Sequence, residues 1–192
     1  VQPKIKQLVD LLFKKVPAGV GCKGFVNVNK EEFDKVMENG SQWCLENGYA
    51  WEEDIKHTES EGKIPQADAS KVSEKARVRG IKQIGTLGSG NHYLEIQVAK
   101  KENIFLPEIA AKMGITKPDQ VVIMVHCGSR GFGHQVASDY LKLFNAAMPK
   151  YGLTVLDKEL ACAPFNSPEG QDYFKAMACA ANMAFANRQV IT

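Results

Sequence analysis

The 192-residue sequence lacks any apolar run long enough to cross a bilayer, although 44% of its residues are hydrophobic. Its start, Val1-Gln-Pro-Lys-Ile-Lys, also lacks the apolar core of a secretory signal peptide. We therefore predict no membrane association for this chain. Because the sequence starts with valine rather than methionine, we expect its natural beginning to lie further upstream.

Charge imbalance and paired cysteines are also absent. The 24 basic and 22 acidic residues give a net charge of +2, which is too balanced to predict a basic coat for nucleic acid. Any contact with RNA would then come from a local site. The five cysteines are odd in number and show no CxxC spacing. We interpret them as free thiols in a reducing compartment, and we expect a cytoplasmic or nuclear protein.

Periodic patterns predict a mixture of helices and strands without a regular βαβ alternation. Helices are expected over residues 3–16, 30–46, 70–80, 106–113, 133–148 and 168–192. Ser167 is expected to cap the last helix, with Pro168 in its first turn. The apolar run over residues 120–126 predicts a buried strand, and a second strand begins near His92. The acid-rich residues 52–68 are expected to form an exposed connection.

Two histidines lie beside glycine-rich backbone at the predicted strand ends. His92 follows the loop Gly-Thr-Leu-Gly-Ser-Gly-Asn and opens one strand, and His126 closes the other. Imidazole is the commonest transition-metal ligand, and a strand end holds a ligand rigidly. The pair therefore indicates a metal site that needs further ligands, because two histidines are too few for tight binding. The alternative is two ordinary histidines with no ligand.

The segment His-Cys-Gly-Ser-Arg-Gly after the second strand has the composition of a phosphate-binding turn. Gly128 and Gly131 supply permissive backbone, Ser129 supplies a hydroxyl and Arg130 a guanidinium, all at the start of a predicted helix. Backbone N–H groups at a helix N-terminus and an arginine side chain both bind phosphate. The alternative is a plain strand-to-helix turn with a solvated arginine. We expect a mostly structural role for His134.

Asn91 and Glu95 lie on either side of the first histidine. The amide of Asn91 can donate to an oxyanion or a phosphate. In a regular strand Asn91, Tyr93 and Glu95 share one face, and His92 points to the other. His92 and Glu95 therefore reach one cavity only if the strand begins at a bend. The alternative for Glu95 is an outward, solvated carboxylate.

A basic segment precedes these motifs. Its cations are Lys71, Lys75, Arg77, Arg79 and Lys82. A helix with so many cations is suited to following a nucleic-acid backbone, and the alternative is a charged face in solvent. We interpret Cys127 as a small buried apolar residue rather than a metal ligand.

Three long segments carry these motifs in a fixed order. They are VSEKARVRG…QIGTLGSGNHYLEIQ, VHCGSRGFGHQV and ACAPFNSPEGQDYFKAMACAANMAFANRQ. Together with PAGVGCKG and GYAWEEDIKHTESEGKIPQAD they resemble the RtcB-type RNA-splicing ligases over essentially the whole chain. The resemblance implies an α+β fold in which a β-rich, sandwich-like core is flanked by helices. Residues 1–192 would form part of a single RtcB-type catalytic domain that lacks its N- and C-terminal portions.

The resemblance also implies an activity. Such a ligase joins an RNA 3′-phosphate or 2′,3′-cyclic phosphate end to a 5′-hydroxyl end, in tRNA splicing or RNA repair, using GTP and Mn²⁺. In the family a histidine is guanylylated, GMP passes to the RNA 3′-phosphate, and the 5′-hydroxyl displaces GMP. A full site would hold two Mn²⁺ ions. The implied partners are RNA (tRNA exon halves) and, in some lineages, archease and a larger tRNA-ligase complex.

By motif match, the family's roles carry over to particular residues of this chain. The implied Mn²⁺ ligands are His92 and His126. The implied GTP-binding residues are Asn91, His92 and Glu95. Phosphate at the ligation junction would be held by Gly128, Ser129, Arg130 and Gly131. The residues implied along the RNA path are Lys75, Arg77 and Arg79.

The chain also departs from the family pattern. It contains no Asp-x-x-Cys motif and no third metal-binding histidine, and the nucleophilic histidine is expected downstream of Thr192. We therefore expect no catalytic residue in the chain and no activity from the chain alone. The competing interpretation is an inactive segment that binds metal or phosphate weakly. A metal-dependent phosphoesterase has less support, because no cluster of carboxylates accompanies the histidines.

Overall fold

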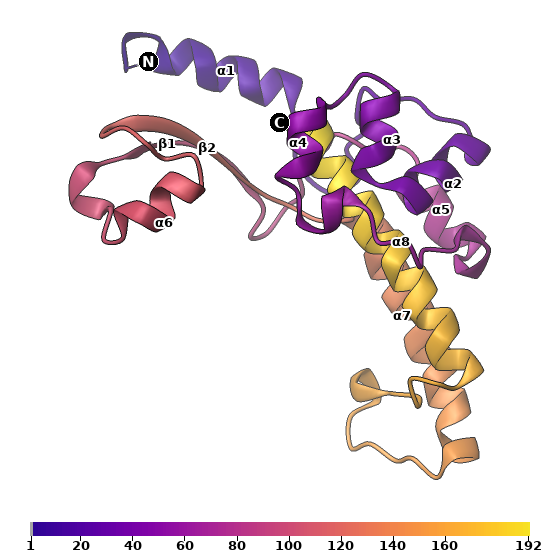
Figure 1. Ribbon diagram of the computed structural model, residues 1–192. Coiled ribbons are helices and arrows are strands. Elements are labelled where there is room, and N and C mark those ends of the chain that lie inside the picture. The colour runs from indigo at the N-terminus through magenta and orange to yellow at the C-terminus, as the bar shows by residue number, and fades with distance from the viewer. Residues whose placement is uncertain (1) are drawn as a thin grey trace.

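The computed structural model describes residues 2–192 and is built mainly from helices (Figure 1). The α-helices are α1 (Ile5–Lys15), α2 (Lys30–Asn39), α3 (Ser41–Glu46), α4 (Glu52–Lys56), α5 (Glu74–Gly80), α6 (Pro107–Lys112), α7 (Arg130–Ala147) and α8 (Pro168–Ile191). The strands are β1 (Tyr93–Ala99) and β2 (Gln120–His126). Within residues 2–192, no helix combines the length and the apolar character needed to cross a membrane.

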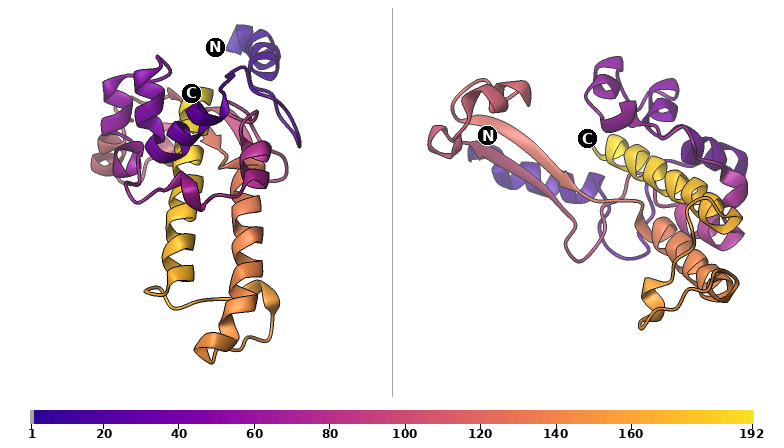
Figure 2. Two further views of the ribbon diagram at one scale, coloured as in Figure 1. Left: turned by 90° about the vertical axis from the view of Figure 1, so that its right-hand side faces the viewer. Right: turned by 60° about the horizontal axis from the view of Figure 1, so that its bottom comes forward.

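The two longest helices, α7 and α8, lie side by side and extend away from the rest of the molecule (Figure 2). The predicted start of α8 is confirmed, because Ser167 Oγ accepts a hydrogen bond from the N–H of Gly170 at 3.1 Å. Small residues let the two helices approach closely. A Cβ added to Gly133 of α7 would lie 3.4 Å from the Cβ of Ala180 on α8. Helix α8 also packs against α2 and α3.

The hydrophobic core lies where α2, α5, α7 and α8 meet. Phe33 of α2 and Phe132 of α7 are fully buried and pack edge to face, with ring centroids 5.5 Å apart. Gly80 ends α5 against both rings, and a Cβ there would come within 2.6 Å of Phe33 and 2.9 Å of Phe132. This packing fixes the first turn of α7, which carries the predicted phosphate-binding residues.

The helix predicted over residues 30–46 is wrong in one respect, because the structure divides it into α2 and α3 at Gly40. Gly40 has a φ of 56°, and a Cβ there would lie 2.2 Å from the carbonyl oxygen of Gly62. This close approach of two backbone segments requires glycine at position 40. Residues 52–68, predicted as an exposed connection, include α4 and a 3-10 helix, Glu59–Gly62.

Two helices begin at residues other than those predicted. α5 begins at Glu74, where Ser73 Oγ accepts from the N–H of Ala76 at 3.1 Å. Asp68 instead caps a short 3-10 helix, Ala69–Lys71. α7 begins at Arg130, earlier than predicted, so that the arginine of the phosphate motif belongs to the helix itself.

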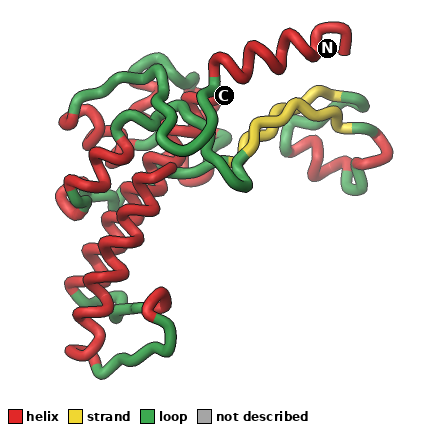
Figure 3. Tube along the Cα trace, turned by 180° about the vertical axis from the view of Figure 1, so that it is seen from behind, coloured by secondary structure: helices red, strands yellow, loops and turns green. Residues whose placement is uncertain are grey.

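The predicted β-rich, sandwich-like core is wrong for the residues that the structure describes. β1 and β2 form an antiparallel pair, with Tyr93 opposite His126 and Ala99 opposite Gln120. Figure 3 shows this pair extending away from the helical body. The hydrophobic core comes from helices and the segments between them, and neither strand contributes a residue to it. The described fold is therefore mainly helical with one β-hairpin.

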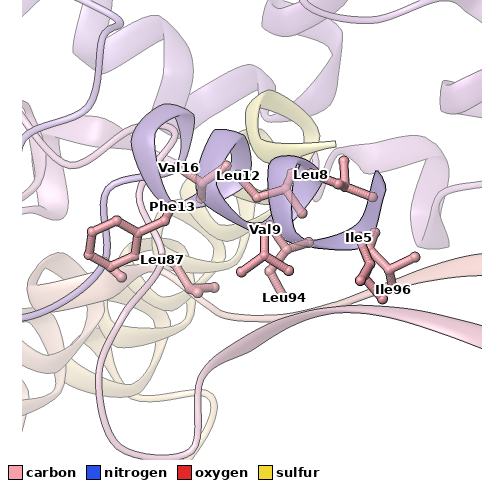
Figure 4. Close-up of a pocket in the computed structure, with 10 residues that line it drawn as sticks. Ile5, Leu8, Val9, Leu12, Phe13, Val16, Leu87, Leu94 and Ile96 are labelled. Atoms are coloured by element: carbon pink, nitrogen blue, oxygen red, sulfur yellow. The ribbon is translucent and has the colours of Figure 1, made fainter. Parts of the chain in front are cut away.

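β2 is a strand as predicted, but the prediction that it is buried is wrong. Ile123 is 62% exposed and Val121 is 45% exposed. A continuous apolar run is typical of a strand covered on both faces, and a two-stranded sheet cannot cover itself. On one face, the apolar side of α1 lies beside Leu94 and Ile96 of β1 around a cavity of about 250 Å³ (Figure 4).

Candidate metal and phosphate site

The glycine-rich loop that leads into His92 has a buried, hydrogen-bonded base. Thr86 is fully buried, and its Oγ1 donates to the carbonyl of Gln83 at 2.7 Å. The N–H of Leu87 donates to the carbonyl of Pro17 at 2.9 Å. The loop then turns through Gly90, which has a φ of 72°. These bonds anchor the base of the loop to Gln83 and to the segment at Pro17.

His92 and His126 lie close together where the two strands begin and end. Their ring centroids are 5.9 Å apart, and Tyr93 stacks on the ring of His126 at 5.4 Å. Nδ1 of His92 is buried and lacks a hydrogen-bond partner among the described residues. Burial, and then the charges of Arg130 and His126, lower the pKa of His92. The ring is therefore neutral at neutral pH, which is the form that binds a metal ion.

No third candidate ligand accompanies the histidine pair in the part of the chain that the structure describes. Within residues 2–192, no group of three or more histidine, cysteine or acidic side chains has the geometry to hold a metal ion. Cys127 is buried and its pKa is raised by that burial, in agreement with the interpretation that it is a small apolar residue.

Glu95 lies on the same face of the hairpin as His126. Tyr93 pairs with His126 and Glu95 pairs with Met124, so these side chains share one face of the sheet. His92 precedes the regular strand, which begins at Tyr93, and its ring lies beside His126. Glu95 is exposed and accepts a hydrogen bond from the side chain of Gln97.

The turn between β2 and α7 brings Arg130 next to the glycine-rich loop. Arg130 is half-buried and has a φ of 58°, a left-handed conformation that is costly for a residue with a side chain. Its Nε donates to Thr86 Oγ1 at 3.0 Å, and its Nη2 donates to the carbonyl of Gly19 at 2.8 Å. Burial lowers the pKa of Arg130, but the guanidinium stays charged at neutral pH.

Gly88 makes room for both the histidine and the arginine. A Cβ at this position would lie 1.5 Å from His92 Nδ1 and 2.4 Å from Arg130 Nη1. The two side chains therefore converge on the space in front of the Gly88 backbone. A cationic guanidinium beside an imidazole forms an arrangement that suits a phosphate group.

The other residues of the predicted phosphate motif are used in different ways. The N–H of Gly131 donates to the side chain of Gln83 at 3.0 Å, so this donor is already paired. Ser129 precedes α7 and makes no capping hydrogen bond with its side chain. Around Gly128 the space is open, since a Cβ there would meet no atom within 4 Å.

The three predicted RNA-path cations differ in their surroundings. The Arg77 side chain is 12% exposed, and its Nε lies 2.8 Å from Asp34 Oδ1. Its Nη2 also donates to the carbonyl of Ala69 at 2.6 Å. Lys75 and Arg79 are exposed. The guanidinium of Arg77 is therefore paired within the protein, while Lys75 and Arg79 face solvent.

A basic groove of about 460 Å³ lies beside this turn. Its lining includes Lys23, Arg79, Lys82 and His134 and no acidic residue. His134, for which a mostly structural role is expected, also lines this groove, and its Nδ1 lies 3.5 Å from Arg79 Nη1. Lys23, which the sequence analysis did not single out, belongs to the same groove. The groove adjoins Gly131 and therefore leads to the phosphate motif.

Comparisons with known proteins agree with the motifs. The family model for "tRNA-splicing ligase RtcB" matches residues 1–192. The chain belongs to the RtcB family. The chain is 52% identical over 192 residues to a tRNA-splicing ligase RtcB of Methanococcus maripaludis, and it covers 39% of that protein. The corresponding protein of Thermococcus kodakarensis is 53% identical with 39% covered, and that of Methanocaldococcus jannaschii is 52% identical with 20% covered.

The chain thus spans about two fifths or less of the length of these RtcB relatives. All 192 residues align with them. The histidine pair, the glycine-rich loop and Arg130 consequently form one part of an RtcB protein. One further residue that sequence reasoning missed, Asn187 of α8, contacts both loops of this site.

Proposed function

We propose that the full protein containing this chain is a GTP- and Mn²⁺-dependent RNA ligase that joins 3′-phosphate or 2′,3′-cyclic phosphate ends to 5′-hydroxyl ends. The observation that carries the proposal is the convergence of His92, His126 and Arg130 at the base of one hairpin. The family match over the whole chain supports the same reaction class. The nucleophilic histidine and the remaining metal ligands would come from other parts of the full protein.

The histidine pair fits a manganese ion. His92 has a buried Nδ1 without a hydrogen-bond partner, and its lowered pKa keeps the ring neutral. Mn²⁺ accepts imidazole nitrogen together with oxygen ligands. When bound, the ion would neutralise charge on a transferring phosphate and orient it for in-line attack. His92 and His126 would hold it from one side.

We assign different residues around this pair to the nucleotide and to the RNA. Asn91 and Glu95, one residue before and three residues after His92 in the sequence, are both exposed, and we assign them to the GTP phosphates and to the guanine. Arg130 we assign to a phosphate at the ligation junction, since its guanidinium lies next to His92. Open backbone at Gly128 supports the same assignment.

The RNA strand would then follow the basic groove. Arg79 is exposed there, and Lys75 lies in the same helix with its side chain in solvent. We assign Arg77 to supporting this helix, because its donors are already paired with Asp34 and Ala69. We also assign Lys23 and Lys82 to the RNA path, because both line the groove. tRNA exon halves are the proposed substrates, with an archease-type protein as a proposed activator.

Ligation assays on the full protein test the proposal. The substrates are RNA ends with a 3′-phosphate and a 5′-hydroxyl, with GTP and Mn²⁺ present. His92→Ala and His126→Ala are each expected to reduce ligation by at least ~100-fold, because each removes a metal ligand. His57→Ala is the matched control, since His57 is exposed at the end of α4 and bonds the carbonyl of Glu53. Retained ligation in either site variant would contradict the assignment.

A further inference from the structure

Two asparagines of α8, Asn182 and Asn187, are fully buried. In Asn187, Oδ1 accepts from the N–H of Gly85 at 2.8 Å and from the N–H of Thr86 at 3.1 Å. Its Nδ2 donates to the carbonyl of Thr86 at 3.1 Å and to the carbonyl of Gly128 at 3.0 Å. Nδ2 also donates to Cys127 Sγ at 3.5 Å, so the side-chain amide is fully hydrogen-bonded, mainly to backbone.

The backbone groups that Asn187 bonds belong to the two loops of the candidate site. Gly85 and Thr86 form the base of the loop that ends at His92. Gly128 lies between His126 and Arg130. One buried side chain thus ties together two loops that are far apart in the sequence. It lies behind the site, because its bonds are made to loop backbone and not to the side chains that converge beside Gly88.

Neighbouring bonds point to the same junction. Arg188, the next residue of α8, donates from Nη1 to the carbonyl of Cys127 at 3.2 Å. Arg130 donates from Nε to Thr86 Oγ1 at 3.0 Å. Asn187 is the one among these side chains that contacts both loops while being completely buried. Hydrogen bonds in a buried, low-dielectric setting hold such a junction more firmly than exposed ones.

We propose that Asn187 is a positioning residue for the metal and phosphate groups, an inference that rests on the proposed function. By fixing Thr86 and Gly128, it sets the separation of His92 and His126 and the placement of Arg130. Metal and phosphate groups need their ligands held to within about 0.5 Å of the productive geometry. A small relative shift of the two loops would therefore weaken Mn²⁺ binding, even though Asn187 touches neither the ion nor a substrate.

The chain contains a matched control in Asn182. This residue lies in the same helix, is equally buried and has a fully bonded amide. Its Nδ2 donates to the carbonyls of Met37, Glu38 and Ile64, and its Oδ1 accepts from the N–H of Ile64 at 2.7 Å. None of these partners belongs to the two loops. Loss of Asn182 should therefore lower stability by the same physical route without moving the site.

The test compares Asn187→Ala and Asn182→Ala in the full protein. Thermal unfolding is measured first, followed by the Mn²⁺ dissociation constant from electron paramagnetic resonance of the free ion. Both variants are expected to unfold at a lower temperature than the parent protein. Asn187→Ala is expected to raise the Mn²⁺ dissociation constant by about 10- to 100-fold, as for residues that orient metal ligands. Asn182→Ala is expected to change it by less than about threefold.

Equal Mn²⁺ dissociation constants in the two variants would overturn the positioning role. If Asn187→Ala does not fold, Asn187→Ser takes its place, since a serine hydroxyl retains one acceptor for the loop N–H groups. A parent protein that neither binds Mn²⁺ nor ligates RNA would instead overturn the proposed function. The two failures are thus distinguished by the behaviour of the parent protein.

Discussion

Replacing Arg77 with alanine is expected to destabilise the protein far more than replacing Lys75 or Arg79. The Arg77 side chain is 12% exposed, and its Nε lies 2.8 Å from Asp34 Oδ1. Nη2 donates to the carbonyl of Ala69 at 2.6 Å, and Nη1 donates to the carbonyl of Val72. The substitution therefore removes one ion pair and two backbone hydrogen bonds at once.

The expected loss can be worked out from this geometry. Breaking a fully buried ion pair by removing one partner costs about 3–5 kcal/mol. Asp34 is 34% exposed and regains part of its hydration, so we expect a loss of about 2–4 kcal/mol. For a folding unit of the 192 residues of this chain, that loss lowers the unfolding temperature by roughly 4–16 °C. Arg77→Lys keeps the charge but not the planar fork, so its loss should be smaller but clear.

Circular dichroism during thermal unfolding measures the change in unfolding temperature. RNA binding is measured on the same samples. Arg79→Ala and Lys75→Ala are expected to stay within about 0.5 kcal/mol of the parent in stability, because both residues face solvent. Each should weaken RNA binding and reduce its salt dependence. The reasoning is refuted if Arg77→Ala keeps the parent stability and weakens RNA binding as much as Arg79→Ala does.

Two further predictions concern Gly88 and Glu169. Gly88→Ala is expected to reduce ligation about 100-fold and to lower the unfolding temperature, because the new Cβ would displace His92 and Arg130, and Arg130 bonds Thr86 and Gly19. Steady-state kinetics and thermal melting check this, and a fully active variant contradicts it. The hydroxyl of Tyr151 is the main cause that lowers the pKa of Glu169 to about 2 from its ordinary 4.5. This carboxylate therefore stabilises the fold above pH 4.5 and loses that contribution as the pH falls towards 2. Tyr151→Phe is expected to raise that pKa in a carboxyl NMR titration and to flatten the stability curve across this pH range. An unchanged titration would show that the hydroxyl is not the cause.

Local signals in the sequence predicted several elements well. The periodicity of residues 3–16 predicted α1, and Ser167 with Pro168 predicted the start of α8. These features depend on a few neighbouring residues, so they can be predicted without knowing what packs nearby. The sequence placed His92 and His126 at the ends of two strands. The antiparallel pairing of these strands in the structure brings the two rings close together.

Features that depend on distant segments were not predictable in the same way. The break at Gly40 depends on the carbonyl of Gly62, which comes 22 residues later in the chain (62 minus 40). The apolar run of β2 predicted burial, but burial depends on what covers the sheet, and Ile123 is 62% exposed. The family resemblance implied a β-rich core, whereas the described residues form a helical one.

In the candidate site, too, the features that depend on distant segments could not be predicted from the sequence. Arg77 and Arg79 lie two residues apart in a basic segment, and the direction of each depends on the fold around α5. Asn187 lies in one of the segments that carry the family resemblance, but its contacts with Thr86 and Gly128 arise from tertiary packing. The sequence carries no signal that separates Asn187 from Asn182, since both are asparagines of one helix and differ in their tertiary partners.

The central claim is that His92 and His126 hold one metal ion beside Arg130. A crystal structure of the full protein soaked with Mn²⁺, with the ion located by anomalous scattering, tests it most directly. The account predicts one manganese peak bonded to a ring nitrogen of both histidines, with the Arg130 guanidinium facing the same space. Manganese bound to other residues, with the two imidazoles left unbound, would contradict it.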